Sequence, residues 1–384
     1  MAFKPALPSR STVKVALWTL VWLAAIDVGV NLAFGISPAS SNSPSALMRY
    51  FEYGRSVEGK LRRMVADPQG AGLIVGAGWI EADKLKALPD KAADGADLMV
   101  AVYGQSFAFM AAKEAAKQDG RITLRLVGGP SAPPNHSFAA YQSDTARSPA
   151  DVVVVGVLSS SVGRMGALSG LFPTFENPAP FTFPRYRLSN GKLEAEWPLI
   201  RSEAEFRSAF AERSPLWQQF KQQLARSDRG YSSFVFDESS LDNSSIVRLI
   251  RRGWVAHRQP YDDAVYKASA GFRPDSPDMK SLDAMLVEMG RQSRDRKERL
   301  IVLLLNTKGR SDYLRAALAP GLEKAGIEYL STSDYFSAND PSNFAPDLHY
   351  TNAANIKFSS ALLKSIRRNA PDSSLPTSNQ VGGR

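Results

Sequence analysis

Apolar runs alternate with amphipathic segments along much of this chain, and their lengths separate strands from helices. Short continuous apolar runs predict buried strands at Leu98–Tyr103, Ile122–Val127, Asp151–Val157, Leu300–Asn306 and Ile327–Leu330. Helices are expected over Phe107–Gln118, Tyr313–Ala325 and Thr351–Arg367. Strands without a polar face, separated by helices, are typical of a parallel sheet covered on both faces. We therefore expect an α/β fold over residues 97–368.

A long segment between the third and fourth strands, about residues 165–295, lacks this rhythm. Ser189-Asn190-Gly191 separates two strand-like runs and predicts a β-hairpin. Amphipathic helices are expected over Ser202–Arg213, Trp217–Arg226, Ser239–His257 and Met279–Arg291. We interpret the segment as a large, mainly helical insertion that caps the sheet.

The N-terminal region predicts a membrane anchor. Val13–Phe34 is almost wholly apolar and long enough to span a bilayer as a helix. Basic residues precede it without any acid, so the positive-inside rule places residues 1–12 in the cytoplasm and the bulk of the chain in the periplasm. We expect the anchor at 13–35, a linker and helical lead-in at 36–96, and a disordered tail at 369–384.

Two polar residues, Asp27 and Asn31, lie in the second half of the apolar segment. Either this end of the helix lies among the lipid headgroups, or these side chains contact another helix. A cleaved signal peptide is the alternative to an anchor, but the apolar run is longer than a usual signal core.

The composition excludes several classes of site. The chain has a net charge of +9 and a pI near 9.6, but no basic block interleaved with aromatic residues, so we expect no nucleic-acid partner. It contains no cysteine, which excludes disulfides and thiolate metal sites. We expect neither a metal nor a cofactor.

Candidate chemistry begins at the end of the first strand, where Gly104-Gln105-Ser106 precedes a helix. A serine at this position presents its hydroxyl at the end of the sheet, close to the positive end of the helix dipole. Its backbone N–H is also placed to receive a developing oxyanion. The alternative is an ordinary helix N-cap, a role for which serine is favoured.

A second candidate motif, Asp347-Leu348-His349, precedes the last helix. The chain has three histidines, and histidine titrates near neutral pH, so His349 is the preferred general base. Asp347 would orient the imidazole, with Asp340 as the nearby alternative. Thr351 or Asn352 is expected to cap the helix.

Further polar groups follow the second and third strands. Gly128 is a candidate oxyanion donor through its backbone N–H, although a tight turn explains it equally well. Ser159 and Ser160 either donate to an oxyanion or cap the next helix. Asn135 and His136 are expected in a loop, where Asn135 is a possible substitute donor.

Together these residues resemble the SGNH/GDSL hydrolase superfamily, which implies a flavodoxin-like three-layer α/β/α fold. Gly104-Gln105-Ser106 resembles the family's nucleophile motif, Gly128 its glycine after the second strand, and Asp347-Leu348-His349 its late Asp-x-x-His. The resemblance covers about residues 97–164 and 299–367.

Three positions depart from the family pattern. Gln105 stands where the family usually has aspartate, and Ser159 and Ser160 stand where it often has an oxyanion-hole asparagine. The Asp-x-His is one residue shorter than usual. Loss of one oxyanion donor typically lowers the rate on the order of a hundredfold.

The resemblance implies a membrane-anchored serine esterase or O-acyltransferase that acts on acyl esters, acetyl esters above all, of a cell-surface polysaccharide. Other envelope biosynthesis proteins are possible partners. The alternative is a catalytically degenerate domain that binds polysaccharide or scaffolds an export complex. A phosphate-binding flavodoxin-like domain is disfavoured, because the chain lacks a phosphate-cradling glycine loop.

Overall fold

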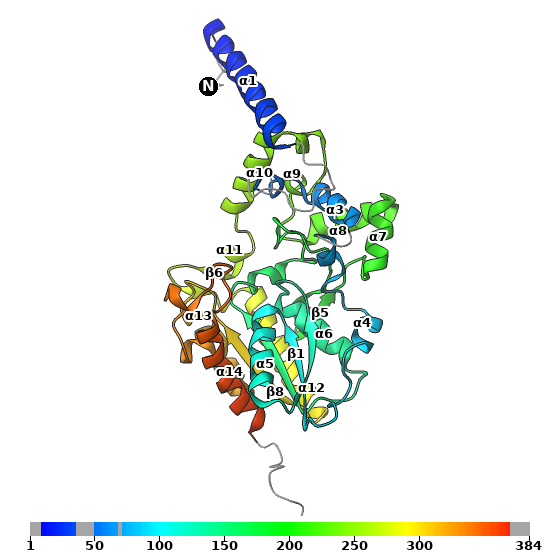
Figure 1. Cartoon of the computed structure of the whole chain (residues 1–384), viewed down its shortest axis with the longest axis vertical. Coiled ribbons are helices and arrows are strands. Elements are labelled where there is room, and N and C mark those ends of the chain that lie inside the picture. Colours follow the sequence, from blue (N-terminus) through cyan, green and yellow to red (C-terminus); the bar gives the residue numbers. More distant parts are fainter. Residues whose placement is uncertain (1–8, 36–49, 68–70, 369–384) are drawn as a thin grey trace, which may run out of the picture. The chain divides into compact units, whose positions relative to one another are not determined.

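The computed structural model describes residues 9–35, 50–67 and 71–368 (Figure 1). Residues 36–49 and 68–70 of the expected linker and helical lead-in, and the whole expected tail at 369–384, lie outside these residues. The chain divides into two compact units. The first contains residues 1–77, 169–181 and 203–260, and the second contains residues 78–168, 182–202 and 261–384. The segment expected to form one insertion, 165–295, is therefore shared between both units.

The second unit is built on a five-stranded parallel sheet, as the apolar runs predict. Its strands are β1 (Leu98–Gly104), β2 (Ile122–Gly128), β3 (Val152–Leu158), β8 (Arg299–Leu305) and β9 (Glu328–Ser331). They pair in the order β2-β1-β3-β8-β9, and every pairing in this sheet is parallel. This order is that of flavodoxin-like doubly wound sheets, which bind ligands beyond the carboxyl ends of their strands.

Helices cover both faces of the sheet. Helices α5 (Ser106–Asp119) and α14 (Asn352–Arg367) pack on one face, where the alanines of α5 lie against the valines of β1 and β3. Helices α6 (Pro134–Asp144), α12 (Pro277–Asp295) and α13 (Tyr313–Lys324) pack on the other. This arrangement explains why β1 and β3 are buried along their whole length.

Helix α6 corrects one expectation. Asn135 and His136 were expected in a loop, but they lie in the first turn of α6 and both are buried. Pro133 is the N-cap, and Pro134 occupies the first helical position, where a missing backbone N–H costs nothing. Pro133-Pro134 was therefore a helix-start signal rather than a loop signal.

Shorter elements complete the second unit. The expected hairpin is present as β4 (Arg185–Ser189) and β5 (Lys192–Glu196). Its turn residues Asn190 and Gly191 both have positive φ, as the twist of a two-residue hairpin requires. Other short elements of the unit are α4 (Ala82–Lys86), α11 (Asp262–Val265), β6 (Tyr266–Lys267) and β7 (Gly271–Phe272).

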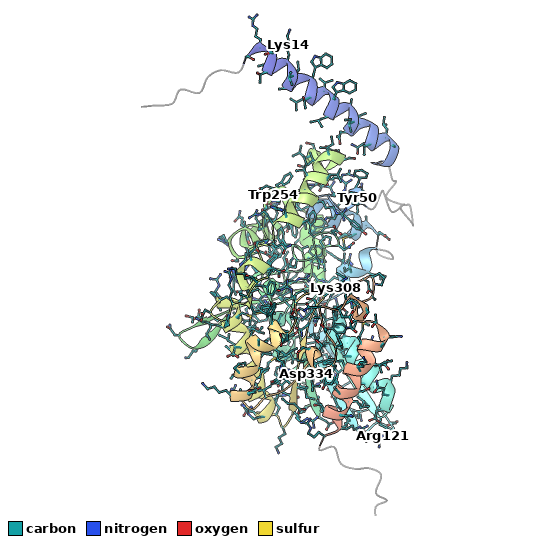
Figure 2. All side chains as sticks on the ribbon, turned by 90° about the vertical axis from the view of Figure 1, so that its left-hand side faces the viewer. Lys14, Tyr50, Arg121, Trp254, Lys308 and Asp334 are labelled. Atoms are coloured by element: carbon teal, nitrogen blue, oxygen red, sulfur yellow. The ribbon has the colours of Figure 1, made fainter. Side chains whose placement is uncertain are left out.

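The first unit is mainly helical. It contains α1 (Arg10–Val30), α3 (Val57–Ala66), α7 (Glu203–Ala211), α8 (Pro215–Ser227), α9 (Ser233–Phe236) and α10 (Ser245–His257). Its core forms around buried Trp217, whose ring packs against Phe210 and Phe236. Trp217 also donates its Nε1–H to Glu58 of α3, 2.8 Å away. Figure 2 shows Tyr50 and Trp254, two exposed aromatic residues of this unit.

Helix α1 is apolar over residues 10–33 and long enough to cross a membrane. Ser9 caps it by accepting the Thr12 N–H. None of its residues is buried.

Candidate active site

Ser106 lies at the junction of β1 and α5, where tight packing brings the helix close to the sheet. Helix α5 begins at Ser106, and Gln105 is its N-cap. The helix approaches so closely that a Cβ on Gly156 of β3 would lie 2.5 Å from the Cβ of Ala108. Glycine at 156 therefore allows the first turn of α5 to pack against the strand ends. Ser106 itself is exposed.

The structure brings Ser106, His349 and Asp347 together in one hydrogen-bonded chain. Ser106 Oγ lies 2.7 Å from His349 Nε2. His349 Nδ1 lies 3.0 Å from Asp347 Oδ2. These distances match the relay in which a base removes a serine proton while a carboxylate orients the base. Since Ser106 is the first helical residue and its hydroxyl contacts His349, it is not the helix N-cap.

A tight turn makes the short Asp-x-His spacing sufficient for this contact. Leu348 N–H donates to Ala345 O, which closes a turn with Pro346 at its second position. Ala345 N–H donates to His349 O, and Leu348 has φ of 69°, in the left-handed region. Hairpins with three-residue loops commonly have a residue in this left-handed conformation directly after the turn. It turns the chain so that residues 347 and 349 face each other.

Asp347 is bound to His349 through both of its oxygens. Oδ1 accepts the His349 backbone N–H at 3.1 Å, and Oδ2 faces the ring nitrogen. These hydrogen bonds, the backbone one foremost, hold the pKa of Asp347 below its usual range. The carboxylate is 68% exposed, so water screens its charge.

Aromatic packing fixes the plane of the imidazole. The His349 ring stacks on Phe107 at 4.7 Å between centroids. Phe107 in turn packs edge-on against Tyr350, whose hydroxyl donates to Asn306 O at 2.9 Å. Ser106 and His349 are therefore both held at the same end of the sheet, through Phe107 and Tyr350. Phe107 was missed from the sequence, where it reads as an ordinary apolar residue of an alanine-rich helix.

The backbone N–H of Ser106 has no acceptor within its own helix, which an oxyanion donor requires. The first hydrogen bond of α5 runs from Phe109 N–H to Gln105 O, and the Gln105 side chain does not cap the helix. The N–H of Ser106 therefore belongs to the helix-end donors that have no intrahelical acceptor. Gly128 pairs with Gly104, two residues before Ser106, and a Cβ at 128 would collide with the Gly104 carbonyl. The glycine thus allows the ends of β1 and β2 to approach each other.

The other candidate donors differ in what they contact. Ser159 is buried, and its Oγ lies 2.8 Å from Thr307 Oγ1 and accepts the Thr307 N–H at 2.9 Å. Asn135 is buried in α6 and donates to Pro184 O at 2.8 Å. Ser160 is half-buried, directly after Ser159. The structure therefore ties Ser159 and Asn135 to other parts of the unit.

The remaining candidates occupy structural positions. Asp340, the alternative partner for the base, accepts the Ser342 N–H at 2.9 Å and caps a short 3-10 helix. His136 Nε2 lies 2.7 Å from Gly78 O, and its burial lowers its pKa to about 4. Thr351 caps α14 by accepting the Ala354 N–H, as predicted.

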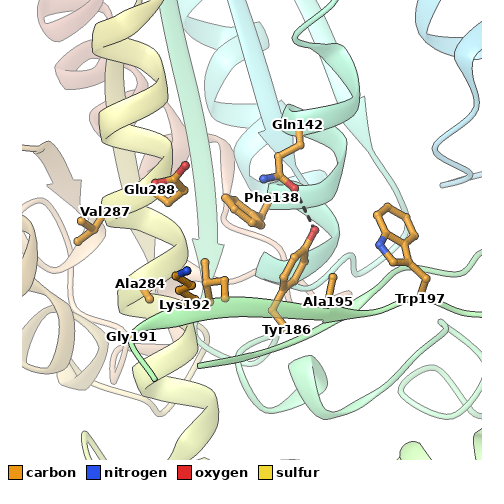
Figure 3. Close-up of a pocket in the computed structure, with 11 residues that line it drawn as sticks. Phe138, Gln142, Tyr186, Gly191, Lys192, Ala195, Trp197, Ala284, Val287 and Glu288 are labelled. Atoms are coloured by element: carbon orange, nitrogen blue, oxygen red, sulfur yellow. Dashed lines mark hydrogen bonds between the residues drawn. The ribbon is translucent and has the colours of Figure 1, made fainter. Parts of the chain in front are cut away.

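A separate hollow lies on the opposite face of the unit, between the β4–β5 hairpin and helices α6 and α12 (Figure 3). Its volume is about 550 Å³, and Phe138, Tyr186 and Trp197 are among the residues that line it. Tyr186 crosses it to donate to Gln142 at 3.2 Å. None of Ser106, Asp347 and His349 lines this hollow.

Comparison with known proteins adds little to this geometry. No family model matches the chain, and no curated protein matches it. A crystal structure of an α/β hydrolase enzyme from the metagenome of Lake Arreo, Spain, is similar over 71% of this chain and 96% of its own, with 10% identity and a TM-score of 0.35. A TM-score of 0.35 is too low to establish a shared fold.

Proposed function

We propose that the chain is a membrane-anchored, periplasm-facing serine esterase or O-acyltransferase of the SGNH type. The observation that carries this proposal is the chain of contacts from Ser106 Oγ to His349 Nε2 and from His349 Nδ1 to Asp347. An apolar helix at residues 10–33 supports the anchor.

In the proposed reaction, His349 Nε2 takes the proton of Ser106 as Oγ attacks the ester carbonyl. Asp347 holds the imidazole in the tautomer with a proton on Nδ1 and stabilises the imidazolium. The N–H of Ser106, with Gly128 as the second proposed donor, receives the oxyanion. The ester C–O bond then breaks, and the alcohol leaves with the proton from His349. Water or a sugar hydroxyl next attacks the acyl-serine and regenerates Ser106.

The openness of the site suggests a substrate class. Ser106 is exposed, and the neighbouring Leu348 is 58% exposed. A small acyl group carried on a large polymer can reach such a serine, whereas a buried nucleophile would admit only small molecules. We therefore propose acyl esters, especially acetyl esters, of a cell-surface polysaccharide as the substrate.

The experiment is fluorophosphonate labelling of the full-length protein in detergent, with the adduct located by mass spectrometry. Turnover of 4-nitrophenyl acetate is measured on the same samples. We expect the adduct on Ser106 and loss of both signals in Ser106→Ala. Ser360→Ala is the matched control, because Ser360 lies on α14, where its hydroxyl bonds Gln118 and Ile356 O. Equal labelling and turnover in Ser106→Ala would refute the serine mechanism.

One observation favours a non-catalytic alternative. The hydroxyl of Ser159, at the position where the family's asparagine often stands, is bonded to Thr307. A domain in which the residue at this position gives no hydrogen bond to an oxyanion would suit polysaccharide binding or scaffolding of an export complex. Absence of labelling in the folded wild-type protein, together with retention on a polysaccharide matrix, would support this alternative.

A further inference from the structure

Helix α10 buries arginine side chains and exposes apolar ones, which is the opposite of the usual arrangement in a helix at a water-facing surface. Its arginines Arg248 and Arg251 are buried, whereas Leu249, Ile250 and Trp254 are exposed. The exposed fractions of Ile250 and Trp254 are 56% and 48%. A surface helix of a soluble domain normally buries its apolar stripe and exposes its charges.

The buried arginines explain how the helix is held in this orientation. Arg251 donates to Asp242 at 2.6 Å and to the carbonyl oxygens of Phe234 and Gly54. Arg248 donates to Glu52 at 2.8 Å and to Asp242 O. Because removing one partner of such a pair leaves a buried charge, these contacts resist rotation of the helix. The apolar stripe is therefore a stable surface of the folded unit.

The first turn of α10 is joined to the last turn of α1. Asp27 Oδ1 accepts the backbone N–H of Ile246 at 2.9 Å. Asn31 Oδ1 accepts the hydroxyl of Ser245, also at 2.9 Å. Asp27 and Asn31 thus find partners at the N-terminus of another helix of the same chain. If α1 spans a bilayer, this junction lies at the level of the headgroups.

The residues that flank the stripe suit a lipid–water boundary. Arg258 lies over the Trp254 ring, and Arg252 lies over the ring of exposed Tyr50 at 4.1 Å. Aromatic rings with basic neighbours are enriched where a protein meets the headgroups. The stripe therefore offers apolar side chains to the acyl boundary and positive charge to lipid phosphates.

We propose that α10 lies on the bilayer that α1 spans, with Leu249, Ile250 and Trp254 inserted among the headgroups. The occupant of the exposed stripe is the lipid surface itself. This proposal rests on the membrane span proposed above, but not on the proposed chemistry of Ser106. The protein would then contact the membrane through two elements, which restricts how the first unit can rotate about its anchor.

The absence of cysteine makes a direct test possible. Single cysteines are introduced into the full-length protein as Ile250→Cys and Trp254→Cys, and each is labelled with an environment-sensitive fluorophore. The proteins are reconstituted in vesicles of phosphatidylcholine and phosphatidylglycerol. Leu20→Cys in α1 reports the span, and Ile356→Cys, an exposed apolar position on α14, is the matched control.

We expect a lipid-borne nitroxide quencher to reach the labels at 20, 250 and 254, and a water-soluble quencher to reach the label at 356. Labels at 250 and 254 that behave like the label at 356 would overturn the proposal. Labels shielded from both quenchers would also overturn it, because a protein would then cover the stripe. A label at 20 that the lipid quencher does not reach would remove the span and the proposal with it. Fluorophosphonate labelling of the same proteins tests Ser106 separately.

Discussion

The left-handed conformation of Leu348 is the feature on which the short Asp-x-His depends, and it can be tested directly. A non-glycine residue in this conformation costs about 1–2 kcal/mol because its Cβ crowds the following carbonyl. Leu348 is 58% exposed, so packing of its side chain gives little in return. We infer that the strain is tolerated because it brings Asp347 to His349.

Three substitutions at 348 distinguish the effect of backbone strain at this residue from the effect of the turn on the Asp347–His349 contact. Leu348→Gly relieves the crowding but loses roughly 0.5–1 kcal/mol of backbone entropy, so unfolding stability should rise by about 1.5 kcal/mol at most. Leu348→Ile keeps the composition but adds a branched Cβ, which disfavours this conformation further. Leu348→Pro fixes φ near −65° and removes the N–H that donates to Ala345 O.

These changes predict a graded loss of activity. If about 1 kcal/mol of the added strain in Leu348→Ile is relieved by displacing Asp347, kcat/KM should fall about fivefold. Leu348→Pro should separate Asp347 from His349 and lower kcat/KM about a hundredfold. That loss is smaller than the roughly ten-thousandfold loss seen when a buried triad aspartate is altered, since Asp347 is exposed.

The assay is 4-nitrophenyl acetate turnover by the full-length protein, with thermal unfolding measured on the same preparations. Leu348→Gly should keep kcat/KM within about twofold of wild type. Wild-type turnover in a folded Leu348→Pro protein would refute the reasoning, because the turn would then be irrelevant to the base. A large loss in Leu348→Gly at unchanged melting temperature would refute it as well.

Two further predictions concern buried positions of the second unit. Gly156→Ala places a Cβ 2.5 Å from Ala108 Cβ, so it should lower unfolding stability by about 1–3 kcal/mol. It should also reduce turnover, because it displaces α5. The stability is measured by denaturant titration, with Gly253→Ala as the control because an added Cβ there has nothing within 4 Å. Burial lowers the pKa of His136 to about 4 in the folded protein, against 6.5 for a free histidine side chain. The unfolded chain therefore binds the proton first as the pH falls, and stability should fall by roughly 3 kcal/mol between pH 6.5 and 4. His136→Gln should flatten that pH dependence, and an unchanged slope would contradict the assignment.

Local patterns sufficed for the sheet and for the meeting of Ser106 with His349. Continuous apolar runs between helices predict parallel strands, and the carboxyl ends of such strands lie at one edge. Ser106 follows β1, and the loop before α14 returns to the same edge, so proximity follows from topology. The contact between Asp347 and His349 does not follow from topology. It depends on the positive φ of Leu348, a conformation that usually requires glycine and that the hydrogen-bonded turn maintains here.

Long-range contacts explain what local patterns could not predict. The ion pair between Glu58 and Arg213, at 2.9 Å, is one of the contacts that join residues 203–260 to the unit that contains α3. The partner of Asp27 is likewise a backbone N–H more than two hundred residues away. Neither contact has a periodicity or motif that marks it in the sequence.

Substitution of Ser159 and of Ser160 can identify which residue after β3, if either, is a third oxyanion donor. Ser159 Oγ is bonded to Thr307, so Ser159→Ala should lower unfolding stability by about 1 kcal/mol and leave kcat nearly unchanged. Ser160, half-buried beside it, remains the candidate side-chain donor after β3. Ser160→Ala should therefore lower kcat about a hundredfold at an unchanged melting temperature. The reverse pattern would assign the donor to Ser159, and full activity in both variants would leave stabilisation of the oxyanion to the amides of Ser106 and Gly128.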